Sequence, residues 1–372
     1  MEQRYDAEEL RRLRRARRRR ELQRRRRRQE LIRRIVVSVV LLLLLAAVAV
    51  AAVGHMMRKE ENAGRKSGRQ GRISGDPETE DLEEPSDDGE DPGTDSEADG
   101  SGGTSGSFAA AEDMVVLGEA DIVSSYAVFV DIEHKTIMAG RGEKERIVPA
   151  SMTKVLTLLV AAEHLEDLDM PYTVPAEVLD YTLRHDCSGA GFEKEETVTV
   201  RDLMYGAILP SGADAALSLA YCVAGSHEAF VDLMNEKLEA LGLSGSAHFT
   251  NCVGIYEENH YCTVYDMAVI MAAAVENEVC REVLSAHTYQ TSRTDQHPDG
   301  ILLSNWFLRR IEDKDTGGEV VYGKTGYVDQ SGSCAVSCGV GADGGMYVCV
   351  TANAYNKWKC INDHAALYKR FS

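Results

Sequence analysis

The chain has 372 residues, enough for two domains, and carries 41 basic and 60 acidic side chains for a formal net charge of −19. The charge is divided unevenly, because residues 1–34 hold sixteen arginines and six acids, a net of +10, and the remainder therefore carries −29. A basic arm can bind nucleic acid, but this one has no aromatic residue except Tyr5 and runs directly into an apolar segment, which favours membrane orientation instead.

The apolar segment, residues 35–53, has nineteen residues with no charge and one hydroxyl, Ser38. At 1.5 Å per residue a helix of this length just crosses about 30 Å of hydrocarbon. We therefore predict a transmembrane anchor over residues 35–57. A cleaved signal peptide is the alternative, since small-residue cleavage sites occur at 47–51. The basic arm and the apolar run are both longer than an ordinary signal, so an uncleaved anchor is favoured.

The arginines lie on the N-terminal side of the anchor, and acidic residues dominate further out on the other side. The positive-inside rule then places residues 1–34 in the cytoplasm as an Arg-rich arm and the rest of the chain outside the cell membrane.

Residues 58–108 have no hydrophobic periodicity. Between positions 76 and 99 there are thirteen acids and no Lys or Arg, and positions 100–107 are almost all Gly and Ser. Such a segment cannot bury enough apolar surface to offset chain entropy. It is predicted to be a disordered linker that holds the folded part away from the bilayer.

Residues 109–372 are long enough to bury a substantial core. Apolar periodicity predicts strands near both ends and helices between them, which indicates an α+β domain with a helical insertion. The expected strands are 125–132, 136–139, 319–324, 333–340 and 346–352, and the expected helices are 149–166, 200–223, 227–241 (with Ser226 as its N-cap) and 361–371.

Nine cysteines are many for an exported chain, and the odd number leaves at least one unpaired in a monomer. None has Cys-x-x-Cys spacing and no His/Cys cluster suggests a zinc site, so no metal and no cofactor is expected. Buried free thiols are favoured over disulfides.

Candidate chemistry begins at Ser151-Met152-Thr153-Lys154, which follows Pro149-Ala150 and opens an apolar helical run. Three residues are just under one helical turn, so the Ser151 hydroxyl and the Lys154 amine share a face. Burial can lower the pKa of a lysine until it takes the proton of a serine nucleophile.

Two further motifs follow, Leu209-Pro210-Ser211-Gly212 about sixty residues later and Gly323-Lys324-Thr325-Gly326-Tyr327 near the C-terminus. The order Ser-x-x-Lys, Ser-x-x, Lys-Thr-Gly is that of penicillin-binding proteins and serine β-lactamases. With residues 251–267, which include His260-Tyr261 and Asp266-Met267, these motifs make residues 121–370 resemble the low-molecular-mass D-alanyl-D-alanine carboxypeptidases. The resemblance implies a β-lactamase/transpeptidase-like fold, a five-stranded antiparallel sheet beside a helical region, in domain 109–372.

The resemblance also implies roles for the catalytic residues. Ser151 attacks and forms an acyl-enzyme, Lys154 takes its proton, and Ser211 passes a proton to the leaving D-Ala nitrogen. The backbone N–H groups of Ser151 and Tyr327 form the oxyanion hole, where one missing donor costs about 3 kcal/mol.

The third motif is expected to bind substrate. By the resemblance, Lys324 keeps Lys154 neutral and attracts the terminal carboxylate, which Thr325 also hydrogen-bonds. Gly326 lets the strand approach the substrate closely.

One position departs from the family pattern. The second motif is usually Ser-x-Asn, and here its third residue is Ala213, while the neighbouring Asp214 would point elsewhere on a helix. Losing the hydrogen bond of that Asn costs on the order of 1–3 kcal/mol.

The implied function is a serine D-Ala-D-Ala carboxypeptidase that acts on peptidoglycan stem peptides and is acylated by β-lactams. A β-lactamase is a weaker alternative, because no glutamate motif for deacylation lies between Ala213 and Lys324. A penicillin-binding sensor or scaffold with little turnover is the other alternative, and Ala213 is its main argument.

Overall fold

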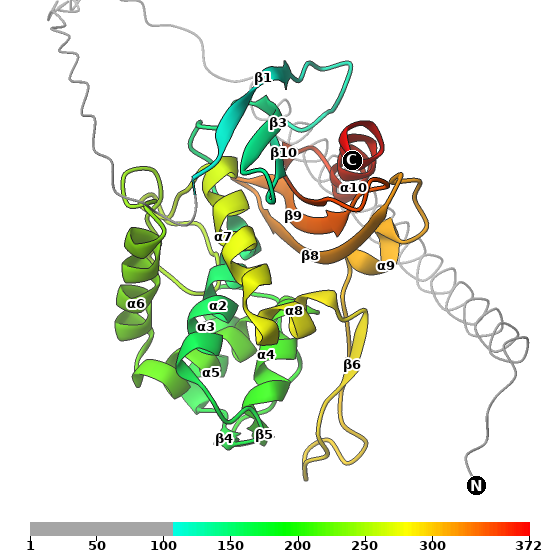
Figure 1. The fold of residues 1–372 in the computed structure, drawn as a ribbon. Helices are drawn as coiled ribbons and strands as arrows, with labels where there is room; N and C mark the ends of the chain where they lie inside the picture. Colours follow the sequence, from blue (N-terminus) through cyan, green and yellow to red (C-terminus); the bar gives the residue numbers. More distant parts are fainter. Residues whose placement is uncertain (1–106) are drawn as a thin grey trace, which may run out of the picture. The chain divides into compact units, whose positions relative to one another are not determined.

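A six-stranded sheet organises residues 107–372, the part of the chain that the computed structural model describes (Figure 1). The strand order is β1-β3-β2-β10-β9-β8, which places β8 at one edge. The strands are β1 (Ala109–Val116), β2 (Tyr126–Asp131), β3 (Thr136–Arg141), β8 (Glu319–Val328), β9 (Gly332–Val340) and β10 (Met346–Ala354).

The expected five-stranded antiparallel sheet is therefore corrected to six strands. β2, β3, β8, β9 and β10 pair antiparallel, whereas β1 adds to β3 in parallel with an irregularity between Ala110 and Val115. The sequence did not predict β1 because its residues are mostly exposed and show no apolar alternation. Backbone pairing along the β3 edge forms this strand, and only Met114 and Val115 pack against the two cores.

The two faces of the sheet hold different cores, because side chains alternate along each strand. Val128 and Val336 face the main core, which the helical region shares. Phe129 faces the other side, where it packs against Tyr347 and Tyr368. Tyr368 belongs to α10 (Lys357–Phe371), which begins four residues earlier than expected because the Asn356 side chain caps it.

The helical region lies between β3 and β8 in the sequence. Its helices are η1 (Ala150–Thr153), α2 (Lys154–His164), α3 (Ala176–Arg184), α4 (Val200–Ile208), α5 (Ala213–Ala224), α6 (His227–Ala240), α7 (Val264–Glu276), α8 (Glu278–Ser285) and α9 (Leu308–Ile311). Two small hairpins accompany them, β4 (Pro171–Thr173) with β5 (Thr197–Thr199) and β6 (Thr288–Gln290) with β7 (Leu302–Ser304).

The helix expected over 200–223 is two helices. The break lies at Leu209-Pro210-Ser211-Gly212, where Pro210 cannot continue a helix and Ser211 has a left-handed φ of +66°. Because of the break, Ser211 lies in the loop between α4 and α5 and not within a helix. The expected cap of α6 is confirmed, since the Ser226 side chain accepts a hydrogen bond from the Ala229 N–H at 3.1 Å.

The predicted arm (1–34), anchor (35–57) and nearly all of the predicted linker lie outside the described residues. Of residues 107–372, no helix combines the length and apolarity needed to cross a membrane. Phe108, which we assigned to the linker, contacts Tyr265 edge-on with ring centroids 6.1 Å apart. The folded part thus already includes that residue.

Candidate active site

Ser151 and Lys154 lie at the junction of η1 and α2, where a one-turn 3₁₀ helix leads into the apolar helix. Lys154 Nζ lies 3.2 Å from Ser151 Oγ, so the sequence spacing does bring the two groups into hydrogen-bond contact. Ala150, directly before the serine, is fully buried with a left-handed φ of +46°. A non-glycine residue in this region is strained, and such strain is frequent at functional sites.

Lys154 is 1% exposed, and burial lowers the pKa of its ammonium from 10.5 to about 8. Its Nζ also donates to the Val253 carbonyl at 2.6 Å, which holds the amine against the segment that follows Phe249. A lysine with this pKa has a sizeable neutral fraction near pH 8 and can then accept a proton from the serine.

The segment that holds Val253 is ordered by Asn251, for which the sequence predicted no role. The Asn251 side-chain oxygen accepts from the backbone N–H groups of Gly254 at 2.7 Å and Ile255 at 3.2 Å. Gly254 has φ +81°, and a Cβ built there would overlap the Ala150 carbonyl oxygen. The residue before Ser151 and the loop that contacts Lys154 are therefore packed backbone to backbone.

Ser211 and Lys324 form a second serine–lysine pair. Lys324 Nζ donates to Ser211 Oγ at 2.8 Å and to the Thr325 carbonyl at 2.7 Å. Lys324 is 2% exposed, and burial, with a smaller contribution from the charge of Lys154, lowers the pKa of its ammonium well below 10.5. Burial thus disfavours the charged form of both lysines in this site.

Strand β8 carries the third motif along the open edge of the sheet, next to η1. A Cβ built on Gly326 would lie 2.9 Å from the Ser151 backbone nitrogen and 2.9 Å from the Pro149 carbonyl oxygen, so only glycine allows this approach. Thr325 is half-buried, while the Tyr327 side chain is 64% exposed and donates to Asp329.

Ala213 and Asp214 follow Ser211 at the start of α5. The Ala213 N–H donates to the Ser188 carbonyl, and Ser188 Oγ donates to the Ser211 carbonyl, both at 2.8 Å. The Asp214 carboxylate accepts from the backbone N–H groups of Ala190 at 2.8 Å and Gly191 at 3.0 Å. Asp214 therefore holds the 188–192 loop against the second motif.

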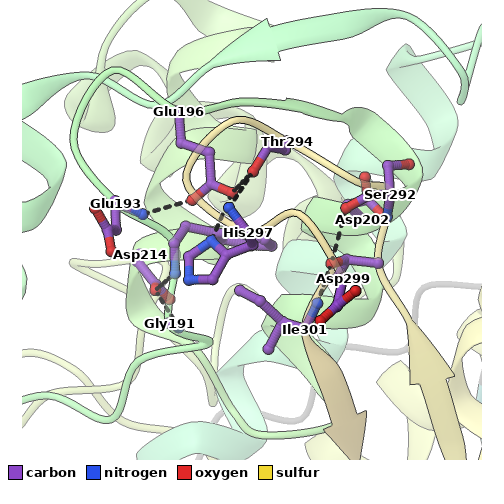
Figure 2. Close-up of polar contacts among 12 residues, drawn as sticks. Gly191, Glu193, Glu196, Asp202, Asp214, Ser292, Thr294, His297, Asp299 and Ile301 are labelled. Carbon is purple, nitrogen blue, oxygen red and sulfur yellow. Dashed lines mark hydrogen bonds and ion pairs between the residues drawn. The ribbon is translucent and has the colours of Figure 1, made fainter.

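Two further buried carboxylates bind the loop between β6 and β7 (Figure 2). Glu196 directly precedes β5, and Asp202 lies on α4. Glu196 is 1% exposed and contacts Thr294 Oγ1 at 2.6 Å and His297 Nδ1 at 2.8 Å. Asp202 accepts from the Ser292 N–H at 3.0 Å. This cluster was not predicted from the sequence, because its members are separated by about ninety residues or more.

All nine cysteines are free in the structure, and all except Cys187 and Cys222 are buried. Burial raises the pKa of the Cys252 thiol to about 12 and that of Cys334 likewise. These thiols pack as small apolar side chains. Within residues 107–372, no group of three or more His, Cys, Asp or Glu side chains is placed to hold a metal ion.

Solved structures share this fold. The Streptomyces K15 DD-transpeptidase aligns with a TM-score of 0.61 at 24% identity, covering 67% of this chain and 97% of that one. A D-alanyl-D-alanine carboxypeptidase from Mycobacterium tuberculosis aligns with a TM-score of 0.58 at 26% identity, covering 67% of this chain and 90% of that one. The fold is thus that of the DD-transpeptidases.

The model of the D-alanyl-D-alanine carboxypeptidase family, peptidase S11, matches residues 112–354, and the chain belongs to that family. DacF of Bacillus subtilis is 32% identical over 152 residues, which are 41% of this chain and 39% of DacF. DacB2 of M. tuberculosis is 31% identical over 220 residues, 59% of this chain and 70% of DacB2. The match to DacF thus spans about two fifths of that relative.

Proposed function

We propose that the protein is a serine-type D-Ala-D-Ala carboxypeptidase that removes the terminal D-Ala of peptidoglycan stem peptides. The observation that supports this best is the pair of serine–lysine contacts, Ser151 with Lys154 and Ser211 with Lys324, in a chain of the carboxypeptidase family. The relatives that the chain matches carry the same activity in their names.

In the acylation step, neutral Lys154 accepts the proton of Ser151 Oγ as that oxygen bonds to the carbonyl carbon of the penultimate D-Ala. The backbone N–H groups of Ser151 and Tyr327 then stabilise the oxyanion, an assignment that the proximity of Gly326 to the Ser151 nitrogen supports. The carbon–nitrogen bond breaks, and the leaving D-Ala nitrogen receives a proton through Ser211. Water then hydrolyses the Ser151 ester and regenerates the hydroxyl.

The third motif orients the substrate. Lys324 and Thr325 hold the terminal carboxylate of the substrate, and Gly326 admits its backbone beside the strand. β-Lactams, which present a carboxylate and a strained amide, acylate Ser151 by the same route. No step in this scheme needs a metal or a cofactor.

The remaining domains are assigned on the sequence alone. We place the Arg-rich arm (1–34) in the cytoplasm, an anchor over 35–57 in the cell membrane, and the acidic linker predicted over 58–108 outside it, with the catalytic domain in the cell wall space. A sensor or scaffold role rested on Ala213, and no observation on the described residues favours it.

The test is D-Ala release from a stem pentapeptide by the full-length chain in detergent micelles, with Ser151→Ala beside it. We expect release by the wild-type chain, none by the variant, and labelling of the wild-type chain alone by a fluorescent penicillin. Penicillin labelling without D-Ala release would reject the carboxypeptidase in favour of a binding protein.

A further inference from the structure

The only two tryptophans of the chain lie close together on one surface of the folded part. Trp306 directly precedes α9, Trp358 is the second residue of α10, and their ring centroids are 5.6 Å apart. Trp358 is 51% exposed, and Tyr355, two residues before α10, is 71% exposed. This surface therefore presents clustered aromatic rings to the solvent, which is typical of an interaction site.

Basic side chains are interleaved with these rings. Arg310 donates to the Trp306 carbonyl at 3.0 Å, and its guanidinium lies 4.1 Å from the Trp306 centroid and 5.7 Å from the Trp358 centroid. Lys357 Nζ lies 4.9 Å from the Trp306 centroid. Such cation–π contacts hold the rings and the cations in one arrangement, so the surface is preformed.

Two further cations extend this surface. Lys359 Nζ lies 5.9 Å from the centroid of the Tyr355 ring, and Arg309 is exposed next to Arg310 on α9. Among the described residues, Arg309, Lys357 and Lys359 form no ion pair. The aromatic–basic patch consists of Trp306, Arg309, Arg310, Tyr355, Lys357, Trp358 and Lys359.

The fold itself does not account for these cations. Lys357 and Lys359 lie in the first turn of α10, which holds no acid, and the helix dipole disfavours positive charge there. The chain after residue 34 carries a net charge of −29, so a cluster of four cations departs from its surroundings. Below the patch, Phe307, Leu308 and Ile361 are buried in one core, which gives the patch a rigid base. These properties suit an external anionic partner.

The chemistry of the patch favours a lipid surface as that partner. Tryptophan and tyrosine concentrate at the interface between a bilayer and water, and lysine and arginine are attracted to anionic headgroups there. An uncharged glycan would need a free indole face on which to stack, whereas two cations, Arg310 and Lys357, lie over the Trp306 ring. An anionic bilayer satisfies both the rings and the cations.

We propose that the aromatic–basic patch docks the catalytic domain on the anionic surface of the membrane in which the chain is anchored. This inference rests on the anchor proposed over residues 35–57 and is independent of the carboxypeptidase activity. The exposed rings enter the headgroup region, and the lysines and arginines pair with lipid phosphates.

The linker predicted over residues 58–108 is long enough for this contact. The folded part begins at β1, and the patch lies by α9, which contacts β8 at the other edge of the sheet. Six strands about 4.8 Å apart are about 25 Å wide, whereas a flexible chain of about fifty residues spans roughly 40 Å. The linker also raises the effective concentration of the patch at the bilayer, so a weak contact suffices.

Docking through the patch leaves the candidate active site accessible. α9 and α10 pack on the face of the sheet opposite to the helical region (Figure 1). Ser151 and the loop with Ser211 belong to the helical region, so a bilayer against α9 and α10 does not cover them. The docked domain thus keeps its site turned away from the bilayer.

The experiment places the full-length chain in phosphatidylcholine vesicles with or without phosphatidylglycerol and measures tryptophan fluorescence. Because both tryptophans belong to the patch, the signal reports the patch alone. In the anionic vesicles we expect emission at shorter wavelength and stronger quenching by lipids brominated on their acyl chains. Both effects should weaken when salt is raised from about 0.1 M to about 1 M, which shortens the Debye length from about 10 Å to about 3 Å.

Two variants assign the signal to the patch. Lys357→Gln combined with Lys359→Gln should lower the ratio of docked to free domain in anionic vesicles about tenfold or more, because each basic residue near an anionic leaflet adds to the attraction. Trp358→Gln leaves Trp306 as the reporter and should also reduce the quenching.

The matched control is Lys144→Gln combined with Lys194→Gln, which removes two exposed lysines elsewhere and should leave the ratio unchanged. D-Ala release from a soluble pentapeptide should be the same in every variant.

Equal quenching in anionic and zwitterionic vesicles, or an unchanged ratio in the lysine variant, would overturn the inference while D-Ala release still upheld the proposed function. An emission shift produced by soluble polyphosphate and by no vesicle would also overturn it, because the partner would then be an anionic polymer. If an alkaline wash strips the chain from the vesicles, the anchor fails, and excess anionic vesicles added to the soluble chain decide on the patch: quenching that the lysine variant loses supports docking, and absence of quenching rejects it.

Discussion

Gly254 lies directly against the carbonyl of Ala150, so the loop that contacts Lys154 and the residue before Ser151 share one backbone contact. Gly254 also has φ +81°, a backbone conformation that residues other than glycine rarely adopt. The backbone of Ala150 is strained by its left-handed φ, and the backbone of Gly254 packs tightly against it.

We predict that Gly254→Ala lowers the free energy of unfolding by about 3 to 4 kcal/mol, because a steric overlap is added to the backbone strain. It should also slow penicillin acylation of Ser151 at least tenfold by displacing the 151–154 turn. Gly225→Ala is the matched control, since Gly225 has φ +76° but no atom within 4 Å of a built Cβ. Chemical denaturation should show a loss of only about 1 kcal/mol there. Equal losses in the two variants would contradict the overlap.

The pH dependence of the reaction follows from Lys154. Burial lowers the pKa of its ammonium to about 8, and the base must be neutral to take the Ser151 proton. We expect kcat/KM for D-Ala release to rise about tenfold per pH unit below pH 8 and to level off above it. Lys154→Arg should be inactive at every pH, because a guanidinium stays charged. A flat profile from pH 6 to 9 in the wild-type chain would exclude Lys154 as the base.

Substitutions of Ser211 are expected to change stability and activity in different directions. Its φ of +66° costs about 1 to 2 kcal/mol for a non-glycine residue. Ser211→Gly should therefore raise the free energy of unfolding by about 1 kcal/mol while lowering kcat about a hundredfold or more, since the hydroxyl is lost. Ser211→Ala should lose the same activity with no gain in stability, as measured by thermal unfolding and D-Ala release. Full activity in both variants would remove Ser211 from the mechanism.

Asp214 is expected to support the second motif through the 188–192 loop. Asp214→Asn weakens charge-assisted hydrogen bonds to the Ala190 and Gly191 N–H groups, so we predict a loss of about 2 to 3 kcal/mol in unfolding free energy and a lower kcat. Asp232→Asn, an exposed carboxylate on α6, is the control for removal of one negative charge. An Asp214→Asn chain with wild-type stability would show that the loop is held by other contacts.

Much of the fold could be predicted from apolar periodicity. Strands β2, β9 and β10 and helix α6 lie within a few residues of their expected bounds, because the three strands are short, largely apolar runs buried on both faces and α6 buries one apolar side. β1 was not predicted because most of its side chains are exposed and it lacks apolar alternation. The break between α4 and α5 was missed although Pro210 marks it, since the apolar pattern continues on both sides.

The sequence alone identified the candidate serines and lysines, because the Ser-x-x-Lys spacing and the three ordered motifs are visible without the fold. The contacts that order them were decided only by the tertiary structure. Asn251, Glu196 and Asp214 bind backbone or side chains supplied by distant segments, and no local pattern encodes such partners. The lowered pKa of Lys154 likewise arises from burial, which exists only once helices and sheet have closed around it.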